Sequence, residues 1–492
     1  MKNLKSSILL TMALVLISGC KEDFLETTPA EIVSDDQVAS SPAAAQGLVN
    51  GIYASLRTFG IGGTTGHTDY GHMSAKIGSD MMAHDITMPF LHWYGFYHNL
   101  TGRLQTSSRT LLTWTTYYSQ IAQCNLLINA TDPTAASEES LHILGQAHAL
   151  KGMMLLRLVQ MYSSPYSQDP SALGIPLPDG QDFLGKPRAT VQDAYDQIVS
   201  DLTAAVGYLN GFTRTSKQEV DLSVANGFLA RAYLDMENWG GARDAALAAR
   251  TGYSLAAYDG FSSLANTEVM WGADIDAESS TVFASFFSHF GNTTPGYTGA
   301  LGVYKGIDRS LYDAIPATDT RRNAFVDPVT GDPTGNGLPA YANIKFIDDT
   351  FFEGDYVYMR ASEMYLIEAE ARAMLGDATA ANVLFELVSF RDPGYTLSTN
   401  TGNTLREEIY LQRRIELWGE GVSYNDLKRL NKPMDRTYSG NNHAAFALLS
   451  YTANGTASKW QIPEAEILAN DQIPATDQNA KNDLKQFDLA EQ

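Results

Sequence analysis

The chain has 492 residues and carries 34 lysine and arginine residues against 56 aspartate and glutamate residues, a formal net charge of −22 at pH 7. A field of that sign repels phosphate backbones, so the charge argues against nucleic acid as a partner and leaves neutral ligands such as sugars or peptides unopposed. A hydrophobic fraction of 44% with 10% aromatic residues excludes wholesale disorder. Single cores stop growing at about 250–300 residues, so we expect several sub-cores or a repetitive scaffold.

The first 19 residues have the pattern of a secretory signal. Lys2 and Lys5 precede an uncharged run of 12 residues, which is shorter than the roughly 20 residues of a membrane span. The stretch Leu16-Ile17-Ser18-Gly19-Cys20 resembles the bacterial lipobox, in which the cysteine becomes the first mature residue and carries lipid. We therefore predict that residues 1–19 are removed, that Cys20 is the lipid attachment site and that residues 20–36 form a tether. The alternative for Cys20 is a buried small hydrophobic residue.

Helical periodicity is clear in the first half of the remaining chain. Capping residues, apolar spacing and following Gly or Pro residues mark each segment. The expected helices are residues 37–59, 111–130, 137–162, 191–209, 222–236 and 239–250. We expect the second and third of these to pack as an antiparallel hairpin, and residues 60–104 to form a loop region.

The second half of the chain alternates between irregular and helical sequence. Gly, Pro, Asn, Thr and aromatic residues predict loops and short strands at 251–358. Further helices are expected at 359–375, 378–390 and 405–418, followed by an irregular tail from residue 421. Segments 222–250 and 361–391 each pair an alanine-rich helix with a second helix, at a size close to the tetratricopeptide unit of about 34 residues. Their separation predicts a dispersed helical scaffold.

Short motifs are spread in order over nearly the whole mature chain. They are Cys20 to Pro29, Asn50-Gly51-Ile52-Tyr53, Trp114 with Tyr118, Ile121 and Asn125, Ala147 to Arg157 with Tyr162, Gly174-Ile175-Pro176-Leu177, Arg413-Arg414 with Glu416, Leu417, Glu420, Gly421, Asp426, Leu427 and Arg429, and Ile462-Pro463 with Glu466. Together these motifs resemble the SusD/RagB family, surface lipoproteins that capture nutrients for an outer-membrane transporter. One departure is Ser423-Tyr424, which stands where the family usually has Arg-Trp.

The resemblance implies a mainly α-helical SusD-like fold that contains tetratricopeptide repeats, an α/α superhelix with a loop-rich ligand face and a few short strands. A single domain would cover 37–492, with a helical scaffold at about 37–250 and 359–420, a loop-rich insertion at about 251–358 and an irregular segment at 421–492. The resemblance also implies a lipoprotein of the outer membrane, facing the extracellular side. It would act without catalysis or a cofactor and deliver its nutrient to a SusC-like TonB-dependent transporter. We expect the motif residues to be structural, with buried Arg–Glu pairs that fix helix crossings.

Two aromatic clusters in the irregular segments form the candidate ligand-binding surface. A neutral oligosaccharide offers apolar ring faces and hydroxyl groups, so its receptor needs flat aromatic rings beside polar partners. The candidate residues are Trp93, Tyr94, Tyr97 and Asn99, with Asp80 and Asp85 close in sequence, and His289, Asn292 and Tyr297. Core packing is the alternative for every ring.

Signatures of enzymes and metal sites are weak. The chain has no Gly-x-Ser-x-Gly, His-Glu-x-x-His or P-loop motif. His67, Asp69 and His72 could supply metal ligands, but nothing beside them supports a second shell, so a polar loop is favoured and no metal is expected. A glycosidase needs only two carboxylates roughly 5–10 Å apart. A lipid-anchored glycoside hydrolase therefore stays an alternative to oligosaccharide binding, as do a peptide- or glycopeptide-binding RagB-like receptor and a protein-interaction scaffold.

Overall fold

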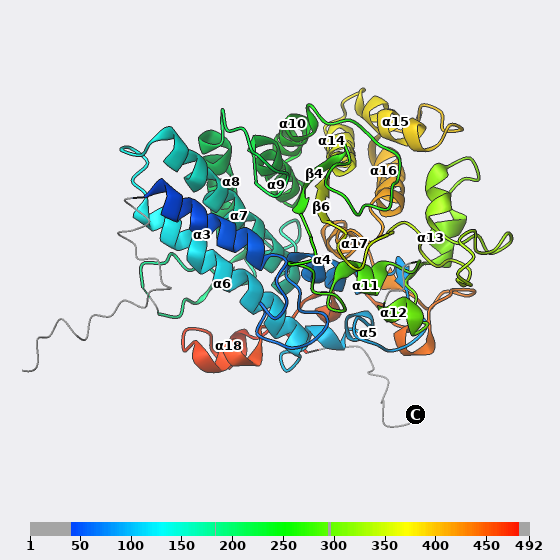
Figure 1. Cartoon of the computed structure of the whole chain (residues 1–492), viewed down its shortest axis with the longest axis horizontal. Coiled ribbons are helices and arrows are strands. Elements are labelled where there is room, and N and C mark those ends of the chain that lie inside the picture. The colour runs from blue at the N-terminus through cyan, green and yellow to red at the C-terminus, as the bar shows by residue number, and fades with distance from the viewer. Residues whose placement is uncertain (1–40, 183, 294–296, 482–492) are drawn as a thin grey trace, which may run out of the picture.

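The computed structural model describes residues 41–182, 184–293 and 297–481. The predicted signal, the lipid attachment at Cys20 and the tether lie outside the described residues. Figure 1 shows long helices over much of the molecule, with short helices and loops gathered around α5, α11 and α12. Among the described residues, no helix is both long enough and apolar enough to cross a membrane.

The first block of helices packs in a row. It consists of α3 (Pro42–Ser55), α6 (Ser108–Ala130), α7 (Glu138–Tyr162) and α8 (Val191–Tyr208). Helix α7 contacts α3, α6 and α8, which confirms the predicted hairpin of α6 and α7. Ser41 caps α3 by accepting from the backbone N–H of Ala44, and Pro42 suits the first helical turn. The helix predicted at 37–59 is thus capped at Ser41 and ends at Ser55.

A glycine allows the close contact between α7 and α8. Gly152 is buried in α7, and a Cβ atom at this position would lie 2.7 Å from Cγ of Leu202 on α8. Gly207 is an exposed glycine of α8, and a Cβ atom there would have no other atom within 4 Å. The two helical glycines therefore differ in the space around them.

We expect Gly152→Ala to lower the free energy of unfolding by about 1–3 kcal/mol, because the added methyl group overpacks the α7–α8 contact. Gly207→Ala is the matched control, and it should be neutral or stabilise the protein by up to about 1 kcal/mol, since alanine is the better helix former. Urea unfolding measures both variants. Equal free energies for the two variants would contradict the tight contact at Gly152.

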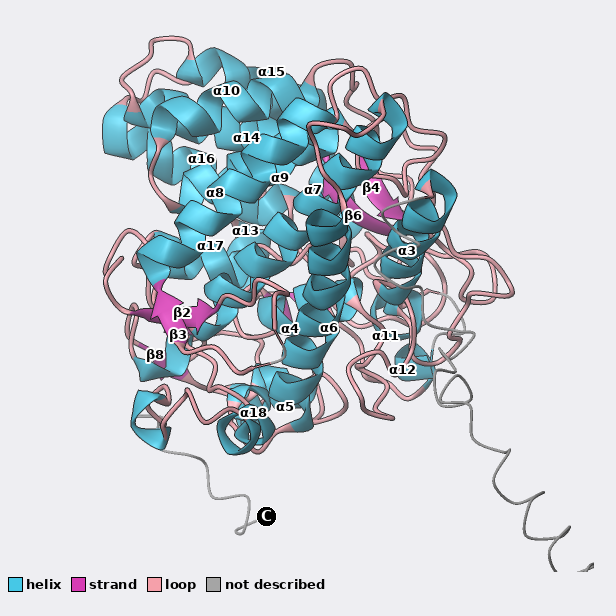
Figure 2. Cartoon of the chain, turned by 90° about the vertical axis from the view of Figure 1, so that its left-hand side faces the viewer, coloured by secondary structure: helices cyan, strands magenta, loops and turns pink. Residues whose placement is uncertain are grey.

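The second block contains helices from two distant parts of the sequence. It consists of α9 (Leu222–Asp235), α10 (Trp239–Arg250), α14 (Ala361–Met374), α15 (Ala380–Arg391) and α16 (Gly402–Glu416). Helix α10 packs on both α9 and α14, and α14 packs on α15 and α16. Figure 2 shows α10, α14 and α15 side by side. The two predicted helical units thus join in one block, and their assignment as tetratricopeptide repeats stays a prediction.

Short antiparallel strand pairs link the helices to the loops. Strand β4 (Val269–Ala273) pairs with β6 (Tyr356–Arg360), and all residues of both strands are buried. The other pairs are β1 (Ile86–Thr87) with β5 (Gly306–Ile307), β2 (Leu173–Pro176) with β3 (Arg188–Thr190), and β7 (Met434–Asp435) with β8 (Ser450–Tyr451). The helix predicted from residue 359 begins at Ala361 because Met359 and Arg360 belong to β6.

Several short helices occupy regions expected to be irregular. They are α4 (His72–Asp80), α5 (Gly95–His98), α11 (Phe286–Phe290), α12 (Tyr297–Ala300), α13 (Arg309–Asp313), α17 (Ser423–Arg429) and α18 (Glu464–Ala469). The prediction of a loop over 60–104 is therefore wrong at α4 and α5. Every residue of α4 is buried, so the helix has no polar face and its sequence shows no amphipathic pattern.

A buried network of ion pairs joins α16 to β6 and α15. Glu268 and Glu416 are both 0% exposed. Arg360 Nη1 lies 2.5 Å from Glu268 Oε1 and 3.1 Å from Glu416 Oε1, and Arg391 Nη2 lies 2.8 Å from Glu268 Oε2. The motif residue Arg413 is also buried and lies 2.6 Å from Asp426. These contacts confirm that the charged motif residues Arg413, Glu416 and Asp426 are structural.

Candidate ligand-binding site

Aromatic side chains from separate segments form a surface cluster on the loop-rich side of the molecule. The cluster consists of His67, His92, Trp93, Phe283 and Tyr297, and is called the aromatic platform below. Phe283 is 47% exposed and the other four side chains are partly exposed. Three short helices lie next to it in sequence, since α5 follows Trp93, α11 follows Phe283 and Tyr297 begins α12. Figure 1 places these three helices close together.

The rings of the platform contact one another directly. His67 and Trp93 are stacked, with centroids 4.5 Å apart and an interplanar angle of 11°. The Tyr297 centroid lies 5.1 Å from that of His67 and 5.7 Å from that of His92. Trp93 Nε1 donates to the Tyr297 hydroxyl at 3.4 Å. Phe283 extends the surface, with its centroid 5.3 Å from that of Tyr297, so segments more than 200 residues apart supply one continuous ring surface.

A buried layer of rings supports the platform from below. His289 is 0% exposed, and its centroid lies 6.1 Å from that of Tyr297. Tyr94 approaches His289 edge-on at 5.2 Å, and its hydroxyl bonds to the Tyr70 hydroxyl and lies 3.2 Å from Ser74 Oγ. Because its polar group has partners inside the protein, Tyr94 is held as a core residue.

The next ring inward is fixed by a glycine of α4. Tyr97 is 0% exposed and stacks on Tyr94 with centroids 5.7 Å apart. A Cβ atom at Gly78 would lie 2.8 Å from the Tyr97 ring. The ring therefore lies directly against the backbone of a buried helix, which gives the platform a rigid base.

The structure divides the predicted binding residues into two groups. Trp93 and Tyr297 belong to the platform, whereas Tyr94, Tyr97, His289 and Asn292 are buried. The expectation that these four contact a ligand is corrected, because a side chain sealed in the core offers no surface to solvent.

The two amides of the predicted set have structural partners. Asn292 Nδ2 donates to the carbonyl oxygens of Lys305 at 2.8 Å and Asn343 at 2.9 Å. Asn99 Oδ1 accepts from the backbone N–H of Thr101 at 3.1 Å and from its hydroxyl at 2.7 Å. Both side chains therefore organise loops beside the platform.

Three platform residues were not among the predicted binding residues. The sequence predicts His67 only as a possible metal ligand, His92 stands directly before the predicted Trp93, and Phe283 precedes the predicted His289 by six residues. The sequence feature that could have indicated these residues is a histidine beside aromatic residues in a predicted loop. That signal does not show which rings meet in space.

Asp80 and Asp85, the carboxylates close in sequence to the first aromatic cluster, bond to structural partners and do not belong to the platform. Asp80 accepts from the backbone N–H groups of Gly421 at 2.7 Å and Ser423 at 2.8 Å, and burial raises the pKa of Asp80 to about 7. Asp85 lies 2.5 Å from Arg414 and accepts from the Ser423 hydroxyl at 2.7 Å. Ser423, which stands at the departure from the family pattern, thus fastens α17 to α4.

His67, Asp69 and His72 do not converge on a metal site. Asp69 accepts from the backbone N–H groups of Gly62 and Thr64, both at 2.9 Å, and so closes its own loop. His72 Nδ1 lies 2.9 Å from the Tyr117 hydroxyl, and His67 belongs to the platform. Within the described parts of the chain, no three His, Cys, Asp or Glu residues are grouped so that they could hold a metal ion.

The platform is an uncharged surface at neutral pH. Burial lowers the pKa of His67, and burial together with the charge of Lys305 lowers the pKa of His92. Flat neutral rings with N–H and O–H groups at their edges can stack on the apolar face of a sugar and bond to its hydroxyl groups.

Comparison with known proteins identifies the family to which the chain belongs. Residues 24–234 match the family described as "Starch-binding associating with outer membrane", and residues 340–487 match the family described as "SusD family". The chain belongs to the SusD/RagB family and has its α-helical fold. No curated protein matches the chain.

Solved structures show the same fold over most of the chain. A SusD-like carbohydrate binding protein from Bacteroides vulgatus is 26% identical, with a TM-score of 0.78, and the match covers 90% of this chain and 99% of that one. A SusD superfamily protein from Bacteroides thetaiotaomicron is 24% identical, with a TM-score of 0.75 over 90% of this chain and 100% of that one. A SusD superfamily protein from Parabacteroides distasonis is 17% identical, with a TM-score of 0.69, and the match covers 90% of this chain and 100% of that one.

Proposed function

We propose that this protein is a non-catalytic receptor that binds an oligosaccharide on the aromatic platform. The observation that carries the proposal is the stacked and partly exposed pair His67–Trp93, with Tyr297 hydrogen-bonded to Trp93 at 3.4 Å. Such a surface offers stacking area together with polar groups, which is what sugar recognition requires. The Bacteroides vulgatus relative is described as a carbohydrate binding protein, which supports the same ligand class.

The same proposal includes a place in the cell and a partner. Lipid on Cys20 would hold the protein at the outer membrane, facing the extracellular side, and a SusC-like TonB-dependent transporter would receive the nutrient. The lipobox-like stretch and the family description "associating with outer membrane" support this part. One main core cluster contains residues from Ala45 to Ile462, which supports a single binding domain over 37–492.

A glycoside hydrolase receives less support from the site. Hydrolysis needs two carboxylates on either side of the scissile bond, roughly 5–10 Å apart. Asp80 and Asp85 are buried and bonded to α16 and the start of α17. Neither of these two carboxylates is therefore available to a sugar on the platform.

A panel of neutral oligosaccharides and peptides tests the proposal. Calorimetry measures binding by the purified protein, and chromatography of the same mixtures measures product release. We expect at least one oligosaccharide to bind and to be recovered intact. Cleaved sugar would favour the hydrolase, and binding of peptides alone would favour the RagB-like receptor.

We expect the affinity for a neutral oligosaccharide to be constant above the ordinary histidine pKa of about 6.5 and to fall in acid, once the pH drops below the lowered pKa values of His67 and His92. The folded protein already holds the pKa values of His67 and His92 below that value. A sugar that covers these rings disfavours their charged forms further, so it binds the neutral forms better. Calorimetry from pH 8 to pH 5 measures the effect. The double variant His67→Gln/His92→Gln should bind with a flatter pH profile, and tighter binding by the native protein in acid would contradict coverage of the imidazoles.

A further inference from the structure

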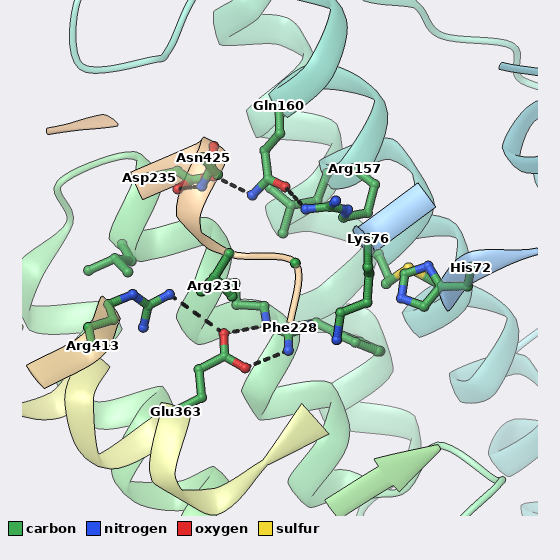
Figure 3. Close-up of a pocket in the computed structure, with 15 residues that line it drawn as sticks. His72, Lys76, Arg157, Gln160, Phe228, Arg231, Asp235, Glu363, Arg413 and Asn425 are labelled. Atoms are coloured by element: carbon green, nitrogen blue, oxygen red, sulfur yellow. Dashed lines mark hydrogen bonds and ion pairs between the residues drawn. The ribbon is translucent and has the colours of Figure 1, made fainter. Parts of the chain in front are cut away.

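A polar cavity lies among α4, α7, α9, α14, α16 and α17 and contains no residue of the aromatic platform. Its volume is about 40 Å³. The basic and acidic residues of its wall are His72, Lys76, Arg157, Arg231, Asp235, Glu363 and Arg413. Figure 3 shows these side chains around the cavity on helices that are distant in sequence, with Arg413 and Glu363 on one side and Lys76 and His72 on the other.

Two of the four cations on the wall have no carboxylate partner. Arg231 lies 2.6 Å from Glu363, and Arg413 lies 2.6 Å from Asp426. Lys76 instead donates to the carbonyl oxygen of Tyr358 at 2.7 Å. Within the described ranges, neither Lys76 nor Arg157 lies within ion-pair distance of a carboxylate.

The bonds of Arg157 are also to neutral groups. It donates to Gln160 Oε1 at 2.9 Å and to Ser79 Oγ at 3.1 Å. Asp80 lies outside the wall, and its two oxygens are taken by the backbone amides of Gly421 and Ser423. Asp235 accepts from Gln160, Tyr195 and Asn425, all neutral donors. The nearby carboxylates are therefore already engaged.

The positively charged groups of Lys76 and Arg231 lie close to each other. Both side chains donate to the same carbonyl oxygen of Tyr358, Lys76 at 2.7 Å and Arg231 at 3.2 Å. Figure 3 shows the two cationic groups side by side. Burial and the charge of Arg231 lower the pKa of Lys76 to about 7. A counter-charge in the cavity would relieve this repulsion.

The fully buried side-chain atoms of the wall that lack a hydrogen-bond partner among the described residues are all nitrogens. His72 Nε2, Arg157 Nε and Arg413 Nη1 are buried and have no hydrogen-bond partner among the described residues. The carboxylate and amide oxygens of the wall are absent from this set. Burial holds the pKa of His72 well below its usual range, so His72 is neutral, and Nε2 can donate when Nδ1 accepts from Tyr117.

We propose that this cavity binds a small inorganic anion of the chloride class, held by Lys76 and Arg157. An anion accepts from several N–H donors at once, whereas a water molecule also brings two hydrogens that need acceptors. The buried side-chain atoms of the wall that lack a partner among the described residues are nitrogens, which matches the anion. Arg157, Arg231 and Asn425 are partly exposed and give the ion a route from solvent.

Crystals of the purified protein soaked in sodium bromide test the site directly. Bromide replaces chloride and scatters anomalously, so we expect an anomalous peak inside the cavity, within bonding distance of Lys76 and Arg157. Peaks confined to the outer surface, with water alone in the cavity, would overturn the proposal.

Thermal unfolding supplies a second readout in solution. At constant ionic strength, replacing gluconate with chloride should raise Tm by roughly 1 °C for each tenfold rise in chloride above its Kd. Lys76→Met should abolish this dependence. Lys305→Met is the matched control, because Lys305 is also buried and, among the described residues, its ammonium group bonds to Thr298 and Val303, so it should keep the dependence. A chloride effect of equal size in the native protein and both variants would contradict binding at Lys76.

Discussion

Replacing Glu416 with glutamine should lower the free energy of unfolding by about 3–5 kcal/mol, the range expected when one member of a buried charge network is removed. Glu416 is 0% exposed and lies 3.3 Å from Arg321, 3.1 Å from Arg360 and 2.9 Å from Arg391. Glutamine keeps the shape of the side chain but leaves the guanidinium groups without this charge. The loss should therefore exceed that of any surface pair.

Glu407→Gln is the matched control for this experiment. Its side chain is 60% exposed and pairs with Lys432 at 2.8 Å, so its loss should cost at most about 1 kcal/mol. Urea unfolding at pH 7 measures both variants. Equal costs for Glu416→Gln and Glu407→Gln would contradict the structural role of the network.

The pH dependence of the Glu416 effect has a defined sign. Burial raises the pKa of Glu416, but Arg391, Arg360 and Arg321 outweigh it and hold the pKa well below its usual range. A lowered pKa stabilises the folded state above the ordinary glutamate value of about 4.3, and this stabilisation is lost as the pH falls below it. The difference between the native protein and Glu416→Gln should therefore shrink in acid.

Trp93→Ala should weaken oligosaccharide binding by about 1–3 kcal/mol, or about 5–150-fold, because it removes the central stacking surface of the platform. Trp93 stacks on His67 and donates to Tyr297. Its loss therefore also removes the contacts that hold the rings of His67 and Tyr297 in place. The side chain is partly exposed, and the buried layer of Tyr94 and His289 stays in place. We expect the melting temperature to change little.

Trp239→Ala is the matched control for the binding experiment. Trp239 is also partly exposed, and it begins α10, which lies away from α5 in Figure 1. Its replacement should leave the affinity unchanged. Calorimetry gives the affinities, and thermal unfolding gives the stabilities. A fall in melting temperature of Trp93→Ala that accounts for the lost binding would show that Trp93 serves the core instead.

Local patterns predicted those parts of the fold that depend on local chemistry. Helix α10 runs over residues 239–250 as expected, and α7 has its predicted end at Tyr162 and its cap at Ser137. Helix α4 was missed because a helix buried on every side carries no amphipathic signal. The start of α3 is decided by the Ser41 cap, and the start of α14 by the strand pairing of Met359 and Arg360.

Only part of the candidate site could be predicted from the sequence, because tertiary contacts bring its residues together. Trp93 and Tyr94 are adjacent in sequence, yet the first is partly exposed and the second is 1% exposed. Composition cannot tell such neighbours apart. The contacts of Trp93 with His67 and Tyr297 depend on how α4, α5 and α12 meet, which no local pattern encodes.

A crystal structure of the complex with the tightest-binding oligosaccharide of the panel tests the central claim most directly. We predict a sugar ring lying flat on Trp93, with Tyr297 and His67 at its edge and its glycosidic bonds intact. A sugar bound elsewhere on the protein, with the aromatic platform uncovered, would contradict the account.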